Sequence, residues 1–153
     1  MSYKSTKLFD GFSCCFRQWK ATETHCQYLH GYAVSFKVTF EGKLDHRNWV
    51  WDFGGMKRAK NLIDNMQPKA WMDYMFDHTV IVAHDDPSSS EIQNLELTGT
   101  AQVRLVEATG AEKFAELIYD KLNKFVRLET DDRVKVTQVE FMENGKNTAI
   151  YGI

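Results

Sequence analysis

No long hydrophobic run occurs in this chain, and none of its segments approaches the roughly 18 consecutive apolar residues that a membrane span requires. The N-terminal sequence MSYKSTKLFDGFS also lacks the apolar core of a secretory signal. A large net charge is missing too, because 19 Lys and Arg residues stand against 21 Asp and Glu residues, for a formal charge of −2. Without a positive field to attract polyanions, we expect no nucleic acid and no membrane as partners.

Cysteine is scarce as well. The three residues Cys14, Cys15 and Cys26 form an odd set with two adjacent members, which does not resemble a disulfide framework. A reducing compartment, the cytoplasm, is therefore the expected location. The length of 153 residues is typical of one domain, so we expect residues 1–153 to form a single domain.

Alternation of apolar and polar residues is the clearest secondary-structure signal. The segment from Tyr32 to Phe40 alternates strictly and predicts a half-buried strand. A noisier alternation from Leu8 to Trp19 predicts a strand before it. The segment 20–29 between the two has few aliphatic residues and is predicted to be a long functional loop.

The C-terminal part of the chain carries a second pair of strand signals. Residues 134–141 alternate with a change of parity at Thr137 or Gln138, which indicates a bulge. The dipeptide Asn144-Gly145 then predicts a hairpin turn before a strand at 148–151.

Helices are predicted between these two pairs of strands. Asp52 is placed to cap a helix that extends to Met66, and Pro68 opens a second short helix. Ser/Thr-x-x-Glu capping boxes occur at 88–91 and 109–112, and apolar residues with helical spacing follow the second box. For the segment 103–106, the pattern does not distinguish a short strand from a buried connection. This order predicts an α+β fold, in which a four-stranded antiparallel sheet carries helices on one face.

Five phrases of the sequence, taken in order, resemble the 6-pyruvoyl-tetrahydropterin and 6-carboxytetrahydropterin synthase family. They are FSCCFR (12–17), CQYLHGY (26–32), NWVWDFGGMK (48–57), the triplet Phe76-Asp77-His78, and the C-terminal set Val139, Phe141, Glu143 and Tyr151. The resemblance implies the tunnelling fold and trimers joined into a hexamer, with active sites at subunit boundaries. It also implies lyase chemistry on 7,8-dihydroneopterin triphosphate or a related pterin, of the kind used in queuosine biosynthesis.

The resemblance further assigns roles to four residues. A base must remove a carbon-bound proton from the pterin side chain, and a thiolate activated by an imidazole can do this. Cys26 matches that base, His78 its proton partner, and Asp77 the carboxylate that orients the imidazole. Glu143 matches the glutamate that binds the 2-amino-pyrimidinone edge of the pterin, because a carboxylate accepts two N–H donors at once.

One departure from the family pattern concerns its zinc ion. The family holds zinc with three histidines, and the matching positions here are Phe16, His30 and Tyr32. Only His30 is a usual zinc ligand, whereas a catalytic zinc normally has three protein ligands. Cys14, His25 and Cys26 are possible replacement ligands, but their spacing fits no standard zinc pattern. We therefore expect no stoichiometric zinc at the family position.

Several functions follow from this mixed pattern. The chain is interpreted as a divergent synthase, with other pterin or purine chemistry on the same pocket as a variant of this reading. A second hypothesis is a pterin- or purine-binding homologue without turnover. Two alternatives come from other classes. One is a cysteine hydrolase that uses Cys26 and His78, which would need an oxyanion hole but no Glu143. The other is a structural assembly protein.

Overall fold

The structure is a computed structural model that describes residues 1–153. Its strands are β1 (Tyr3–Phe16), β2 (His30–Gly42), β3 (Thr79–Ala83), β4 (Val103–Val106), β5 (Val134–Met142) and β6 (Thr148–Gly152). Its helices are α1 (Pro68–Phe76), α2 (Ser89–Leu97) and α3 (Ala111–Glu129), with the 3-10 turns η1 (His25–Gln27) and η2 (Phe53–Met56). None of the helices combines the length and the apolar character that crossing a bilayer requires.

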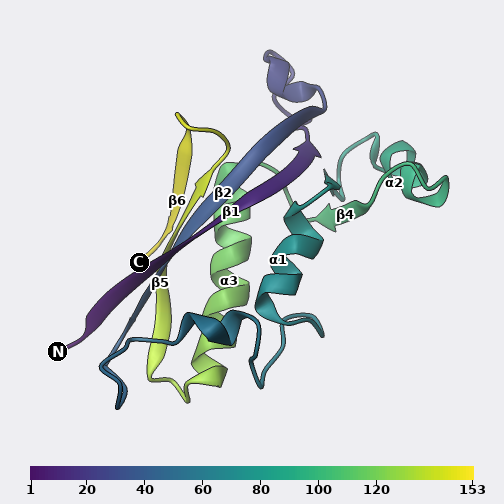
Figure 1. Cartoon of the computed structure of the whole chain (residues 1–153). Coiled ribbons are helices and arrows are strands. Elements are labelled where there is room, and N and C mark those ends of the chain that lie inside the picture. The colour runs from purple at the N-terminus through teal and green to yellow at the C-terminus, as the bar shows by residue number, and fades with distance from the viewer.

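All six strands form one sheet in the order β4-β3-β1-β2-β5-β6 (Figure 1). The predicted antiparallel pairs β1–β2 and β5–β6 are present, and β2 pairs with β5. However, β3 adds to β1 in parallel and β4 adds to β3 in parallel. The prediction of a four-stranded antiparallel sheet is therefore wrong: the sheet is six-stranded and mixed. The sequence TVIVA of β3 is buried at four of its five positions, so no alternation marks it as a strand.

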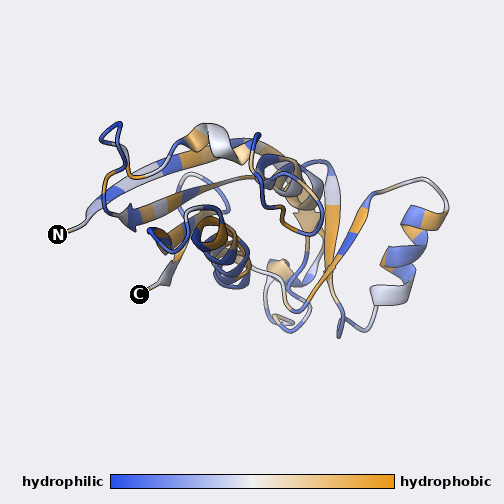
Figure 2. Cartoon of the chain, turned by 90° about the horizontal axis from the view of Figure 1, so that it is seen from below, coloured by the Kyte–Doolittle hydropathy of each residue, from blue (hydrophilic) through white to orange (hydrophobic).

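Two helices cover one face of this sheet, and the main core lies between them and the strands. Figure 1 shows α3 lying across the sheet with α1 beside it, while α2 stands apart beyond β4. Phe76 of α1 and Phe114 of α3 contact each other edge to face, with ring centroids 5.7 Å apart. Hydrophobic residues occur on the strands where they face α3 (Figure 2). The buried side of α3 follows the predicted helical spacing, with Phe114, Ile118, Leu122 and Phe125 all buried.

The segment between β2 and α1 differs from the predicted long helix. Only η2 is helical, and the Asp52 carboxylate caps it by accepting the Gly54 N–H at 2.9 Å. Gly54 and Gly55 favour no helix, and Asp64 and Asn65 adopt positive φ angles that end any helical path to Met66. The predicted helix at 52–66 is therefore reduced to one turn, whereas the short helix that begins at Pro68 is present.

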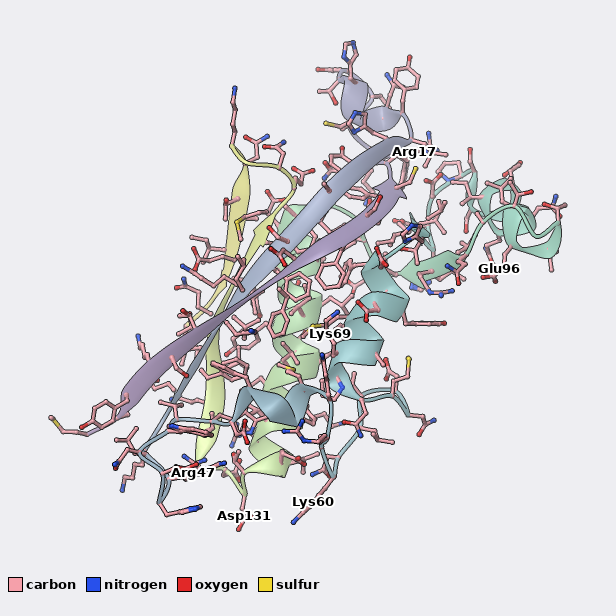
Figure 3. All side chains as sticks on the ribbon, viewed as in Figure 1. Arg17, Arg47, Lys60, Lys69, Glu96 and Asp131 are labelled. Carbon is pink, nitrogen blue, oxygen red and sulfur yellow. The ribbon has the colours of Figure 1, made fainter.

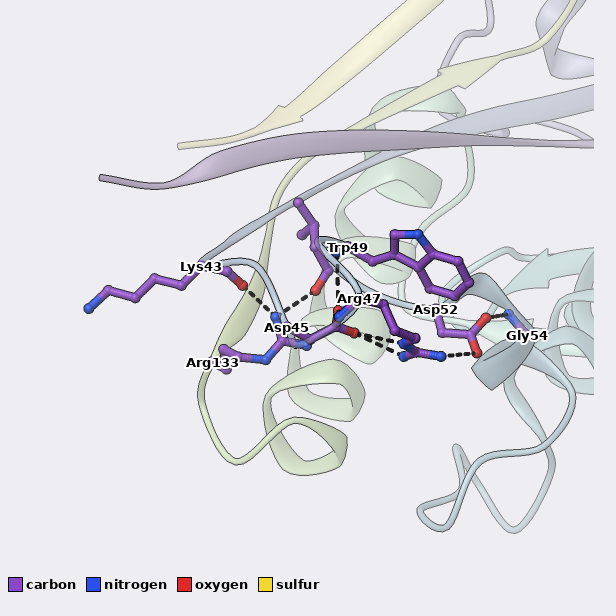
Figure 4. Close-up of polar contacts among 8 residues, drawn as sticks. Lys43, Asp45, Arg47, Trp49, Asp52, Gly54 and Arg133 are labelled. Carbon is purple, nitrogen blue, oxygen red and sulfur yellow. Dashed lines mark hydrogen bonds and ion pairs between the residues drawn. The ribbon is translucent and has the colours of Figure 1, made fainter.

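Polar contacts hold this irregular segment in place (Figure 4). Arg47 bridges two carboxylates, with Nη2 2.9 Å from Asp45 and Nη1 3.2 Å from Asp52. Arg133, which precedes β5, donates to the carbonyl oxygens of Lys43 and Val50. These contacts thus hold the segment against the sheet, although η2 is its one helical turn.

The side-chain caps predicted for α2 and α3 do not form. Ser88 is the N-cap of α2 but accepts no cap hydrogen bond, and Gly110, not Thr109, is the N-cap of α3. The Thr109 hydroxyl instead donates to the Arg17 carbonyl at 2.6 Å, which ties the start of α3 to the end of β1. A long-range contact has replaced the local one.

Removal of a central ring tests this description of the core. Phe36 on β2 is fully buried and lies within 6.1 Å, centroid to centroid, of the rings of Phe9, Phe12, Phe76 and Phe141. We expect Phe36→Ala to lower the free energy of unfolding by about 3–5 kcal/mol, because it leaves a cavity between the sheet and both helices. Urea denaturation measures this loss, and Leu8→Ala at a half-exposed position is the control. Equal losses for the two variants would contradict the packing described.

Candidate functional site

The residues predicted to carry function gather at the end of the sheet where β1 stops and β2 starts. The register pairs Phe16 with His30 and Cys14 with Tyr32 across these strands. Glu143 follows the last residue of β5, the next strand in the sheet. Figure 3 shows Arg17, the residue after β1, at this tip beside the loop that contains η1.

The three positions that match the zinc ligands of the family are brought together by this register, but their side chains form an aromatic cluster. The rings of Phe16 and Tyr32 stack with centroids 4.3 Å apart, and the His30 ring meets Tyr32 edge to face at 4.8 Å. Phe114 of α3 closes the cluster with its ring 4.9 Å from Phe16. Phe16 is fully buried and belongs to the main core.

These residues do not fit a zinc ion held by three protein ligands. A phenylalanine ring has no donor atom, and a stacked tyrosine leaves His30 as the one usual ligand at these positions. No group of three or more His, Cys, Asp or Glu side chains in the chain is arranged to hold a metal ion. The proposed replacement ligands are also dispersed: Cys14 is buried in the core, whereas Cys26 lies exposed in the loop.

Glu143 and Tyr32 share an electrostatic environment at this site. Burial raises the pKa of Glu143, the nearby Glu112 of α3 raises it further, and His30 opposes the shift. Burial also raises the pKa of the Tyr32 phenol, and the negative charges that Glu143 and Cys26 can carry add to this effect. Neither side chain has a hydrogen-bonding partner within the chain. The site therefore presents a half-buried carboxylate and a phenol that are free to bind a ligand.

Cys26 lies in the middle of η1, within the loop that joins β1 to β2, and its side chain is exposed. Thr24 is the N-cap of this turn, and its hydroxyl oxygen accepts the Cys26 N–H at 3.1 Å. Cys14 differs sharply, because burial, followed by the proximity of Cys15 and Asp77, raises its pKa to about 12. Among the three thiols, Cys26 is the most exposed, whereas Cys15 is half-buried and Cys14 is buried.

Asp77 and His78 form a contact pair at the junction of α1 and β3. Asp77 Oδ1 lies 3.2 Å from His78 Nδ1 and also accepts the Ser13 N–H at 3.2 Å. His78 has a φ of 58° and is the one residue with positive φ that is neither Asn, Asp nor Gly. Its imidazole is 80% exposed. The strained backbone thus presents the ring outward, as often occurs at functional positions.

The single chain brings together only part of the predicted set. Cys26, His30, Tyr32 and Glu143 lie in one neighbourhood, and Asp77 lies near Cys14 on the adjoining side of β1. No hydrogen bond or ion pair joins Cys26 to His78 within the chain. Five hollows of the surface, three of them beside η2, are lined by other residues.

Sequence reasoning missed an ion pair beside this site. Arg17 makes two hydrogen bonds to Asp86, from Nε at 2.9 Å and from Nη2 at 2.6 Å. The Asp86 side chain is only 1% exposed, and the hydrogen bond from Arg17 lowers its pKa. The sequence HDDPSSS around Asp86 reads as a polar loop, and nothing in it marks a buried carboxylate.

Comparison with known proteins assigns the chain to a class. The family model described as 6-pyruvoyl tetrahydropterin synthase matches residues 6–152. A 6-carboxy-5,6,7,8-tetrahydropterin synthase of Rickettsia typhi is 32% identical over 120 residues, which cover 77% of this chain and 78% of that protein. This chain belongs to the 6-pyruvoyl tetrahydropterin synthase family.

Solved structures share the fold along almost the whole chain. An uncharacterised protein of Wolinella succinogenes superimposes with a TM-score of 0.79 at 21% identity, and the match covers 99% of this chain and 98% of the other. The 6-pyruvoyl tetrahydropterin synthase of Caenorhabditis elegans gives a TM-score of 0.61 at 16% identity, with 100% and 95% covered. At these identities the likeness concerns the fold alone.

Restoring the missing histidines tests whether the backbone still has the geometry of a three-ligand site. In Phe16→His/Tyr32→His, the β1–β2 register places two new imidazoles beside His30, and three imidazoles are a sufficient zinc donor set. We expect this variant to retain about one zinc per chain after dialysis, and zinc to raise its melting temperature. The wild type is expected to retain no stoichiometric zinc. Elemental analysis and thermal denaturation with and without a chelator measure both.

Phe16→His alone is the matched control, because two imidazoles do not complete the site. A double variant that folds but holds no zinc would show that the register does not converge the three side chains. About one zinc per wild-type chain would instead show that Cys14, His25 or Cys26 supplies the ligands that positions 16 and 32 lack.

Proposed function

We propose that this protein is a synthase-like lyase of the 6-pyruvoyl/6-carboxytetrahydropterin type, which acts on 7,8-dihydroneopterin triphosphate or a related pterin. The name of the Rickettsia typhi relative supports the reaction class, and that relative covers most of the chain. The observation that carries the proposal is Glu143, a half-buried carboxylate with a raised pKa and no internal partner, at the end of β5 beside Tyr32. A half-buried carboxylate without a partner gains no stabilising contact from the fold itself, which favours a role in ligand binding.

Glu143 is the pterin anchor in this proposal. The 2-amino-pyrimidinone edge of a pterin offers two adjacent N–H groups, which match the two oxygens of one carboxylate. The neighbouring phenol of Tyr32 is protonated at neutral pH, as tyrosine ordinarily is, and burial raises its pKa further, so it is a hydrogen-bond donor beside the anchor. The ring of Tyr32, which stacks on the buried ring of Phe16, adds an apolar surface beside the anchor.

Cys26 is the base in this proposal, and Asp77 with His78 is the proton relay. The Cys26 thiolate removes the proton from the side-chain carbon attached to the pterin ring, and the electron pair of the broken C–H bond is delocalised into the adjoining C=N bond of the dihydropterin. Asp77 fixes one nitrogen of the His78 ring, so that the other nitrogen is free to exchange protons with the site. No step is assigned to a metal ion, because the residues at the family position do not fit one.

The proposed active assembly is a homo-hexamer built of two trimers, with sites at subunit boundaries. Cys26 and His78 are not joined within one chain, which supports completion of the site by a second copy. The edge strands β4 and β6 have unpaired backbone groups, and Ile150 on β6 is 61% exposed. Light scattering is expected to give a mass near six times 17.8 kDa, and a strict monomer at working concentrations would contradict the assembly.

Glu143→Gln tests the anchor. The substitution keeps the size of the side chain but replaces an acceptor with a donor, which leaves a mismatched polar pair against the pterin edge. We expect the affinity for 7,8-dihydroneopterin to fall by about 1–3 kcal/mol, roughly 5- to 150-fold in Kd. Isothermal titration calorimetry measures the change. Glu140→Gln is the matched control, since Glu140 pairs with Lys37 on the sheet.

The thermal stability of Glu143→Gln provides a second test of this residue. The folded state binds the Glu143 proton more tightly than the unfolded state, so this residue lowers stability as pH rises above the ordinary glutamate range. At neutral pH, Glu143→Gln is expected to melt no lower than the wild type, and any advantage is expected to vanish at acidic pH. Unchanged pterin affinity would remove Glu143 from the site, whatever the melting curves show.

Cys26→Ala tests the base. Because the Cys26 side chain is exposed and η1 buries no residue, we expect the variant to fold normally and to bind pterin with wild-type affinity. Release of triphosphate from 7,8-dihydroneopterin triphosphate is expected to stop. Cys15→Ala is the control and is expected to keep its activity.

Each result bears on a different hypothesis. Full activity of Cys26→Ala would show that the assigned base is wrong. Pterin binding without turnover in the wild type would favour a binding homologue, and thiol-dependent hydrolysis that does not need Glu143 would favour a cysteine hydrolase.

A further inference from the structure

The loop that carries Cys26 is not held by hydrophobic packing. None of the residues 17–29 is buried, and η1 contributes no side chain to the core. A loop of this kind is mobile unless polar contacts fix it, because burial supplies most of the ordering free energy elsewhere in a fold. A base that must reach one carbon atom of a substrate needs such a fixed position.

Hydrogen bonds nevertheless fix the backbone on both sides of the exposed thiol. The Cys26 N–H donates to the Thr24 hydroxyl oxygen at 3.1 Å, and the Cys26 carbonyl accepts the Gln18 N–H at 2.8 Å. The next carbonyl, that of Gln27, accepts Nη1 of Arg17 at 3.1 Å. Two consecutive residues after β1 thus hold two consecutive carbonyl groups of the Cys26 turn.

Arg17 connects this turn to the rigid part of the molecule. Its Nε and Nη2 bind the two oxygens of Asp86, while Nη1 donates to the Gln27 carbonyl (Figure 3 labels Arg17 at the end of β1, beside the loop). Asp86 is itself fixed, because its Oδ1 accepts the Ser88 N–H at 2.8 Å and its side chain is 1% exposed. Only a guanidinium supplies these three donors in one plane.

A second contact ties the same loop to the neighbouring residue of the β3–α2 connection. The Trp19 indole N–H donates to Asp85 at 3.2 Å, and Lys20 lies 3.6 Å from the same residue. These groups are more exposed than the Arg17–Asp86 pair, so solvent weakens them more. The pair of Arg17 with the buried Asp86 carboxylate therefore dominates the attachment.

We propose that Arg17 is a positioning residue for Cys26, and that its ion pair with Asp86 clamps the turn which aims the thiol at the substrate. This inference rests on the proposed role of Cys26 as base. The clamp acts on the backbone of the turn and touches no substrate atom. It leaves the thiol exposed and restricts its direction, a form of preorganisation that lowers the barrier of the chemical step more than it strengthens binding.

Arg17→Lys is the main test. A lysine keeps the charge opposite Asp86, but its single ammonium group cannot bind Asp86 and the Gln27 carbonyl in the same fork geometry. We expect kcat for 7,8-dihydroneopterin triphosphate to fall about 10- to 100-fold with KM and the melting temperature little changed. Amide hydrogen exchange across residues 18–30 is expected to speed up, while exchange in α3 stays the same.

Two further variants keep the test decisive. Thr24→Val removes the acceptor of the Cys26 N–H without touching the ion pair, and is expected to lower kcat in the same way. Arg127→Lys makes the same chemical change in the surface pair with Asp132, and is expected to alter neither kcat nor loop exchange. Unchanged kcat or unchanged exchange in a folded Arg17→Lys protein would overturn the proposal.

The outcomes also separate this inference from the proposed function. A wild-type protein that turns over no pterin would refute the synthase function, and hydrogen exchange of the 18–30 segment would still decide whether Arg17 fixes the turn. An active wild type together with an equally active Arg17→Lys variant would leave the synthase function standing and reject the positioning role.

Discussion

The pairing of β1 with β2 is the constraint on which the rest of the structure depends. A bulge between Phe9 and Phe12 shifts the register, so the β1 residues that face the helices change from one alternate set to the other. Gly11 lies in this bulge with a φ of 84°, a conformation that is strained for a residue with a side chain. Phe9 and Phe12 are consequently both buried, although three positions separate them. From this point the strand presents Cys14 and Phe16 to the helices, and the same register decides which side chains meet at its end.

Sequence patterns predicted the parts of the fold that alternate or repeat with helical spacing. β2, α3, the C-terminal hairpin and the shift of parity at Thr137 are of this kind, and the last appears as an irregular register between β2 and β5. β3 escaped prediction because it is covered on both sides, and the region 52–66 was misread because its helix signals were local and two glycines opposed them. Elements added at an edge of the sheet depend on long-range pairing, which a local pattern does not encode.

The candidate site was predictable where its residues follow from strand position, and it was not where they depend on tertiary contacts. The grouping of His30 and Tyr32 opposite Phe16 and Cys14 follows directly from the alternation of the two strands. The partner of Arg17 could not be found in this way, since 69 positions separate it from Asp86 and either residue alone reads as surface charge. Removal of Arg17 would leave the buried Asp86 carboxylate without its partner, which destabilises a fold, so this contact constrains the local structure more than its sequence context indicates.

The side chains at the family zinc positions contribute to the packing of this end of the sheet. Burial of a phenylalanine side chain stabilises a fold by about 1.5–3 kcal/mol, and Phe16 is fully buried against Tyr32 and Phe114. The strand ends are therefore held together by ring contacts, with no need of a metal ion to cross-link them. Glu143 and Cys26 take no part in that packing, which is consistent with the ligand-binding and catalytic roles proposed for them. In the proposed function, the core therefore supplies an apolar base for the site, and Arg17 and the end of β5 position Cys26 and Glu143 beside it.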